Sequence, residues 1–194
     1  MKAIGVRWQG ANLGRLTMVI IAGFLLALAG CSKPSKIKYT VNDPKDPNTT
    51  WKTERPLTYA EAISFGHCPI ALPGAATNIQ YIDFYAGYGG FSQFVRFEAP
   101  VGICGEHAKK VLEACNRSQA GTNLLVLVSA SAFDKSTAKS LARWARERVE
   151  PEARAPWFDA DEINHGEIFG ENGSHKPIIL VDTDRGVFYY SLSD

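Results

Sequence analysis

The most constraining feature of this chain is a short apolar run that ends at a cysteine. Fifteen uncharged residues separate Arg15 from Cys31, whereas a helix needs about 20 residues, at about 1.5 Å each, to cross the hydrocarbon core of a bilayer. Lys2, Arg7 and Arg15 precede the run with no acidic residue among them, a pattern typical of an export signal. We therefore expect residues 1–30 to be a signal peptide.

The end of this run reads Leu28, Ala29, Gly30 and Cys31, and all four positions resemble the lipobox of bacterial lipoprotein precursors. In that family, lipid is transferred to the cysteine sulfur and a peptidase cuts just before it. The small residues fit a protease cleft, and a cysteine thiolate is readily alkylated. The resemblance implies a mature protein that begins at Cys31 and is held to the membrane by acyl chains such as palmitate. An ordinary secretory signal or an uncleaved anchor is the alternative.

The residue after the cysteine is Ser32 and not Asp. In the lipoprotein family an Asp there is an inner-membrane retention cue, so the resemblance implies a cell-envelope location, on the periplasmic side of the outer membrane if the host has two membranes. The next residues are rich in proline and charge and show no apolar periodicity. We interpret residues 31–56 as a lipidated N-terminus with a flexible linker, followed by a single globular domain over 57–194.

The nearly neutral charge of the chain bears on which kind of macromolecule it binds. A net charge of +1 argues against a strongly basic nucleic-acid binder. We expect contact with membrane lipid through Cys31, and an envelope protein or a glycan as partner, but no nucleic acid.

Three further cysteines remain, and an oxidising compartment favours one disulfide and one leftover thiol. Cys104 and Cys115 fall on one predicted helix, where they would lie about 16 Å apart, beyond the ~7 Å that a disulfide allows between α-carbons. A predicted hairpin brings Cys104 near the segment of Cys68, so we predict a bond between Cys68 and Cys104. A bond between Cys68 and Cys115, or three reduced thiols, are the alternatives.

The patterns after residue 57 predict an α+β domain, in which an antiparallel sheet of about four strands carries two to four helices on one face. Thr58 and Glu61 form a capping-box pattern before a short helix. Two aromatic and β-branched runs joined by glycines predict one hairpin, and the stretch around 183–186 predicts a second hairpin in mid-sheet. Helices are predicted over residues 58–64, 100–116, 136–149 and 159–166, strands over 76–86, 91–99 and 176–194, and residues 123–132 fit either a strand or a helix.

No catalytic residue, metal site or cofactor is predicted. The most suggestive stretch is "GICGEH", where Cys104 lies in the first turn of a helix and His107 is three residues on; a helix N-terminus lowers the pKa of a thiol, and histidine can serve as its base. Asp182 and Asp184 are spaced as at the start of a calcium loop, but a hairpin turn explains them better. Aromatic residues near the first hairpin tip either pack in the core or form a contact patch: Tyr81, Phe84, Tyr85 and Tyr88.

These features favour a lipid-anchored envelope lipoprotein whose domain is a non-enzymatic binding or structural module. The alternative is a membrane-anchored hydrolase or thiol enzyme that uses Cys104 and His107.

Overall fold

The computed structural model describes residues 49–86, 90–120, 130–170 and 176–194. Its centre is an antiparallel sheet with the strand order β1-β2-β3-β7-β6-β5-β4. The strands are β1 (Thr49–Lys52), β2 (Thr77–Ala86), β3 (Gly90–Glu98), β4 (Ser131–Ala132), β5 (Gly166–Gly170), β6 (Ile178–Asp182) and β7 (Val187–Ser193).

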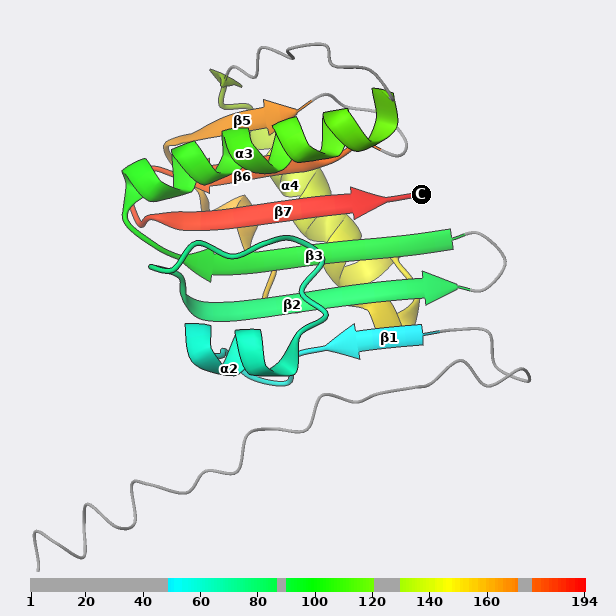
Figure 1. The fold of residues 1–194 in the computed structure, drawn as a ribbon. Coiled ribbons are helices and arrows are strands. Elements are labelled where there is room, and N and C mark those ends of the chain that lie inside the picture. Colours follow the sequence, from blue (N-terminus) through cyan, green and yellow to red (C-terminus); the bar gives the residue numbers. More distant parts are fainter. Residues whose placement is uncertain (1–48, 87–89, 121–129, 171–175) are drawn as a thin grey trace, which may run out of the picture. The chain divides into compact units, whose positions relative to one another are not determined.

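Helices cover both faces of the sheet. The elements are α2 (Tyr59–Phe65), α3 (Val101–Ala120), α4 (Lys135–Arg143), the π-helix η1 (Trp144–Arg148) and the 3₁₀ turns η2 (Pro151–Ala153) and η3 (Ala160–Glu162). Figure 1 shows α3 across the front of the sheet and α4 behind it. The α+β class is therefore confirmed. The prediction of about four strands with helices on one face is wrong, because the described residues form seven strands between two helical layers.

Both faces of the central strands are apolar, which explains the two layers. In β3, Val95 and Phe97 belong to the core under α3, whereas Phe94 belongs to the core under α4, and all three are fully buried. Successive side chains of a strand point to opposite faces. A strand of this kind needs cover on both sides, and a single layer of helices would leave Phe94 in water.

The two predicted hairpins are present. β2 pairs with β3 and β6 pairs with β7, and the second hairpin lies inside the sheet, with β3 on one side and β5 on the other. Ser131–Ala132 of the ambiguous stretch form β4, while residues 121–129 lie outside the described part. Residues 49–52, which fall in the predicted linker, form β1.

Local capping was predicted correctly at one helix and incorrectly at another. Thr58 and Glu61 form the expected capping box at α2, with the Thr58 side chain accepting from the Glu61 N–H and the Glu61 carboxylate accepting from the Thr58 N–H. The capping box predicted at Asp159 and Glu162 is wrong, because Asp159 makes no capping bond and the element is only the 3₁₀ turn η3. Gly166 does not end a helix there but begins β5.

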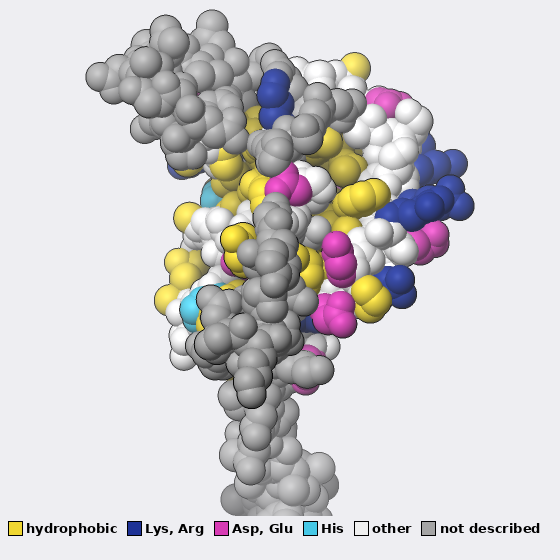
Figure 2. All heavy atoms as spheres, turned by 90° about the vertical axis from the view of Figure 1, so that its right-hand side faces the viewer, with side chains coloured by type: hydrophobic (Ala, Val, Ile, Leu, Met, Phe, Trp, Pro, Cys, Tyr) yellow, Lys and Arg dark blue, Asp and Glu magenta, His cyan; other side chains and the backbone are white. Residues whose placement is uncertain are grey.

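The surface charges are mixed. Figure 2 shows Lys and Arg side chains gathered on one side of the face it presents, with Asp and Glu side chains beside them. On α4 and η1, Arg143 pairs with Glu147 at 3.4 Å and Arg146 pairs with Asp161 at 2.7 Å. Within the described residues, no helix has the length and apolar character needed to cross a bilayer.

Candidate functional site: a groove beside α3

A hollow beside the sheet lies between α3 and residues 69–74, which belong to the connecting segment 66–76 between α2 and β2. It has a volume of about 690 Å³, within the range usual for ligand pockets. Its lining is mostly apolar and includes Ile70, Leu72, Pro73, Ile103, Val111 and Ala114. We refer to this hollow as the α3 groove.

Among the described residues that line the α3 groove, three ionisable side chains other than cysteine occur. Glu106 and Lys110 are exposed and stand one helical turn apart on α3, and His107 lies between them in sequence. An apolar surface with a few polar groups is typical of a binding site, since burial supplies the affinity and polar contacts fix the orientation.

His107 is packed into the wall of the groove. Its side chain is 8% exposed, and its ring makes edge contacts with Phe97 at 5.7 Å and Phe188 at 5.4 Å between centroids. Burial lowers the pKa of His107, more than the Ala71 carbonyl raises it. The imidazole is therefore neutral near pH 7, and its Nε2 atom has no hydrogen-bond partner.

Cys104 lies in the first turn of α3, where its thiol is hydrogen-bonded to backbone carbonyls. Its sulfur contacts the carbonyl oxygens of Ala99 at 3.5 Å and Gly186 at 3.7 Å, and the residue is 0% exposed. Burial raises the pKa of the Cys104 thiol to about 11, so the lowering expected from the helix N-terminus is outweighed by desolvation. A nucleophilic thiol needs the opposite shift and an accessible sulfur.

The structure thus places Cys104 and His107 on the same helix without a hydrogen bond between them. The histidine ring packs on aromatic rings, and the thiol is bonded to backbone carbonyls. This arrangement does not support a nucleophile and base, because the base must contact the proton that it accepts.

A polar cluster lies beneath one end of the groove. The Gln93 amide donates to the carboxylate of Asp83 at 3.0 Å, and the Tyr190 hydroxyl donates to the Gln93 carbonyl oxygen at 3.4 Å. Cys115, which lines the groove, is hydrogen-bonded to Tyr190. Burial raises the pKa of Asp83 above its ordinary value. Cys68 packs on the same core and lies near Asp83.

No disulfide joins the described cysteines: the sulfurs of Cys68, Cys104 and Cys115 are present as thiols. The bond between Cys68 and Cys104 stays a prediction. The contacts of Cys104 with Ala99 and Gly186 do not favour it.

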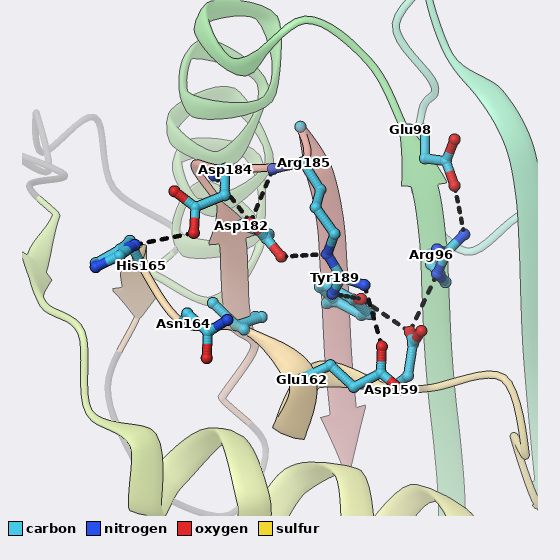
Figure 3. Close-up of polar contacts among 12 residues, drawn as sticks. Arg96, Glu98, Asp159, Glu162, Asn164, His165, Asp182, Asp184, Arg185 and Tyr189 are labelled. Atoms are coloured by element: carbon cyan, nitrogen blue, oxygen red, sulfur yellow. Dashed lines mark hydrogen bonds and ion pairs between the residues drawn. The ribbon is translucent and has the colours of Figure 1, made fainter.

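The aspartates of "VDTDRG" hold a turn. Asp182 is 1% exposed, and its Oδ1 accepts from the backbone N–H groups of Asp184 at 2.9 Å and Arg185 at 3.0 Å. Its Oδ2 accepts from the Arg185 side chain at 2.6 Å, and Asp184 pairs with His165 at 2.9 Å (Figure 3). Within the described part of the chain, no group of three or more His, Cys, Asp or Glu side chains is placed to hold a metal ion.

The same turn is tied to the α4 side of the sheet. Arg185 also reaches Glu162 at 3.1 Å and the Tyr189 hydroxyl at 3.3 Å. Tyr189 donates to Asp159 at 2.8 Å, and Asp159 accepts from Arg96 at 3.2 Å (Figure 3). Each of these groups has a partner, so we interpret the network as structural.

The aromatic residues of the first hairpin divide between core and surface. Tyr81 and Phe84 are buried on opposite faces of β2, whereas Tyr85 is 50% exposed. Tyr88 lies outside the described residues. Core packing therefore accounts for two of the four.

Sequence reasoning missed the segment that completes the groove. Residues 69–74 read "PIALPG". The pattern that could have revealed this wall of the groove is an apolar stretch between two prolines, which is too short for a helix or strand yet too apolar for an ordinary surface loop. The apolar stripe that the sequence predicts on the opposite helix comprises Val101, Cys104, Ala108, Val111, Leu112 and Cys115. Its four central members are buried, whereas Val101 is 39% exposed and Cys115 is half-buried.

Comparison of the chain with protein-family models, with curated proteins and with solved structures gave no match.

Proposed function

We propose that this chain is a cell-envelope lipoprotein, anchored through acyl chains on Cys31, whose domain binds an apolar segment of an envelope partner in the α3 groove. The observation that carries the binding role is the groove itself, an apolar hollow of about 690 Å³ beside α3. The proposed anchoring rests on the apolar run after Arg15 and on the lipobox-like residues at its end, Gly30 and Cys31 among them. The envelope location, on the periplasmic side of an outer membrane where the host has one, is part of the same proposal.

A binding role fits the groove better than catalysis does. Its histidine is packed against two aromatic rings, and the cysteine three residues earlier on α3 is buried with a raised pKa. Apolar burial contributes about 25 cal/mol per Å², so a lining of aliphatic side chains can hold a partner without any covalent step. The hydrolase or thiol enzyme built on Cys104 and His107 remains the second candidate, and no contact between the two side chains supports it.

Anchoring is tested with a fatty acid that carries an alkyne label. Cells that produce the wild-type chain should yield a labelled product whose first residue is Cys31, and the Cys31→Ser variant should stay unlabelled with its leader intact. A wild-type product without label, or one that keeps residues 1–30, would contradict the anchoring.

The groove is tested by site-specific photocrosslinking in the envelope. A benzophenone side chain at Ala114, which is exposed and lines the groove, should give a discrete crosslinked partner. The matched control carries the same group at Ser140, which is exposed on α4, on the opposite side of the sheet. Identical products at both positions, or none at Ala114, would refute a binding role for the groove.

A further inference from the structure

The cysteines of this domain stand in unequal positions, and their surroundings select one pair. We propose that Cys68 and Cys115 form a disulfide that joins the connecting segment to α3 at one end of the groove, while Cys104 remains a thiol. This inference concerns the covalent state of the domain and does not depend on where the protein resides.

Cys115 lies at the end of the α3 groove, above β7. It lines the groove and is hydrogen-bonded to the Tyr190 hydroxyl. Tyr190 pairs with Val95 of β3, and Val95 pairs with Tyr81 of β2. These three residues form one row across the sheet, and since neighbouring strands lie about 4.8 Å apart, Tyr81 and Tyr190 are separated by about 10 Å.

Cys68 approaches the same row from the other side. The Tyr81 hydroxyl donates to the carbonyl oxygen of Gly66 at 2.5 Å, which fixes the start of the connecting segment over Tyr81. Two further residues can advance the chain by up to about 7 Å. Ile70, two residues after Cys68, lines the same groove as Cys115, so the segment runs from Tyr81 toward α3.

The electrostatic surroundings agree with this path. Cys68 lies close enough to influence the hydroxyls of both Tyr81 and Tyr190, and Cys115 also influences Tyr190. Both cysteines pack against the core under α3 and are partly buried. They therefore flank one tyrosine, and the proposed bond requires the connecting segment to hold their α-carbons within the ~7 Å that a disulfide allows.

Cys104 is excluded by its position on the helix. It stands three turns before Cys115, about 16 Å away along α3, and its sulfur contacts the carbonyls of Ala99 and Gly186. These contacts lie at the junction of β3 with α3 and in the turn between β6 and β7. A bond from Cys104 to Cys68 would have to break both of them.

The bond forms by exchange with a small-molecule disulfide such as oxidised glutathione. The thiolate of one cysteine attacks a glutathione sulfur, forming a mixed disulfide and releasing one glutathione thiolate. The second protein thiolate then attacks the protein sulfur of that mixed disulfide and releases the second glutathione. Two protein thiols are oxidised, one glutathione disulfide is reduced, and the two protons pass to the released thiolates.

Burial raises the pKa of Cys68 to about 12 and raises the pKa of Cys115 as well. Because only the thiolate attacks, we expect the bond to form faster during folding, while the thiols are still solvated, than in the folded reduced protein.

The test uses the full chain with Cys31→Ser, which leaves three cysteines. The reduced chain is unfolded in guanidinium and refolded in a mixture of reduced and oxidised glutathione, and remaining thiols are blocked with N-ethylmaleimide. Trypsin cleavage after Arg96, Lys109, Lys110 and Arg117 places each of the three cysteines on its own peptide. Mass spectrometry without reduction should find peptide 53–96 linked to peptide 111–117, and one maleimide on peptide 97–109.

Two variants and one direct oxidation complete the design. Cys104→Ser should keep the link between peptides 53–96 and 111–117, whereas Cys68→Ser should leave maleimide on Cys115. Oxidised glutathione added to the folded reduced chain should produce the same link more slowly. A link from peptide 53–96 to peptide 97–109, or maleimide on all three peptides after both treatments, would overturn the proposal.

Discussion

Replacement of Asp182 by alanine should destabilise the domain far more than the same change at Asp184, two residues on. Asp182 is 1% exposed and accepts three hydrogen bonds, at 2.9, 3.0 and 2.6 Å. Asp184 has a 50% exposed side chain, and its carboxylate pairs, among the described residues, with the 79% exposed His165. The two positions therefore test whether the burial of the carboxylate decides its contribution to the free energy of unfolding.

The magnitude follows from the donors that lose their acceptor. Each of the two backbone N–H groups of the turn loses a bond worth about 1 kcal/mol. The bond from Arg185 is charge-assisted, but its side chain is 38% exposed and regains water, so it adds only about 1 kcal/mol. We expect Asp182→Ala to cost about 3 kcal/mol and Asp184→Ala less than about 0.5 kcal/mol.

An isosteric variant separates charge from hydrogen bonding. In Asp182→Asn the amide oxygen can keep both backbone N–H bonds, whereas the amide nitrogen faces the donor Nε of Arg185. Only the third bond is lost, so the expected cost is about 1 to 1.5 kcal/mol.

Urea unfolding of the purified variants, followed by tryptophan fluorescence, measures these costs as shifts in the midpoint at constant slope. Equal losses for Asp182→Ala and Asp184→Ala, or a loss below about 1 kcal/mol for Asp182→Ala, would show that the turn does not depend on this carboxylate.

Three further predictions follow from single contacts. Gly186→Ala should cost more than about 2 kcal/mol in the same urea assay, because residue 186 has φ of 68° and an added Cβ would strike the Ala99 carbonyl oxygen; an unchanged midpoint would contradict the close approach. The hydrogen bonds of the α4 N-cap lower the pKa of Asp134 to about 2, so its stabilisation is present above the ordinary aspartate pKa and is lost as the pH falls toward 2. Asp134→Ala should therefore lower the urea midpoint at pH 7 but not near pH 2, whereas Asp134→Asn should keep its cap at both. Cys104 in the folded chain should react with iodoacetamide at pH 8 at least about 100-fold more slowly than in the urea-unfolded chain, because burial raises its pKa to about 11 from an ordinary value of about 8.5. Rapid labelling of Cys104 in the folded chain would favour the thiol-enzyme hypothesis instead.

The sequence was sufficient where a local pattern decides the structure. The capping box of Thr58 and Glu61, the two hairpins and the apolar stripe of α3 all depend on neighbours along the chain. The capping box and the hairpins are present, and the stripe is buried from Cys104 to Leu112 but not at Val101. The mid-sheet position of the second hairpin was also predicted, because both faces of its strands are apolar.

The rest depends on contacts distant in sequence. β5 was missed because "GEIFG" is only five residues long and its strand character comes from pairing with β6. The second helical layer was missed because Phe94 alternates with the polar residues Ser92 and Arg96, a pattern typical of a solvent-facing strand surface, whereas α4 and the 3₁₀ turns bury Phe94. The raised pKa of Cys104 shows the same limit, since the helix position suggests lowering and the surrounding core decides otherwise.

The place of β7 in the sheet has a consequence for how the chain matures. β7 is the last of the seven described strands in sequence order, yet it separates β1-β2-β3 from β6-β5-β4. Until residues 187–193 have left the ribosome, β3 presents an unsatisfied edge with Val95 and Phe97 beside it. Such an edge is a template for intermolecular pairing, so we expect the chain to be most prone to aggregation before β7 closes the sheet.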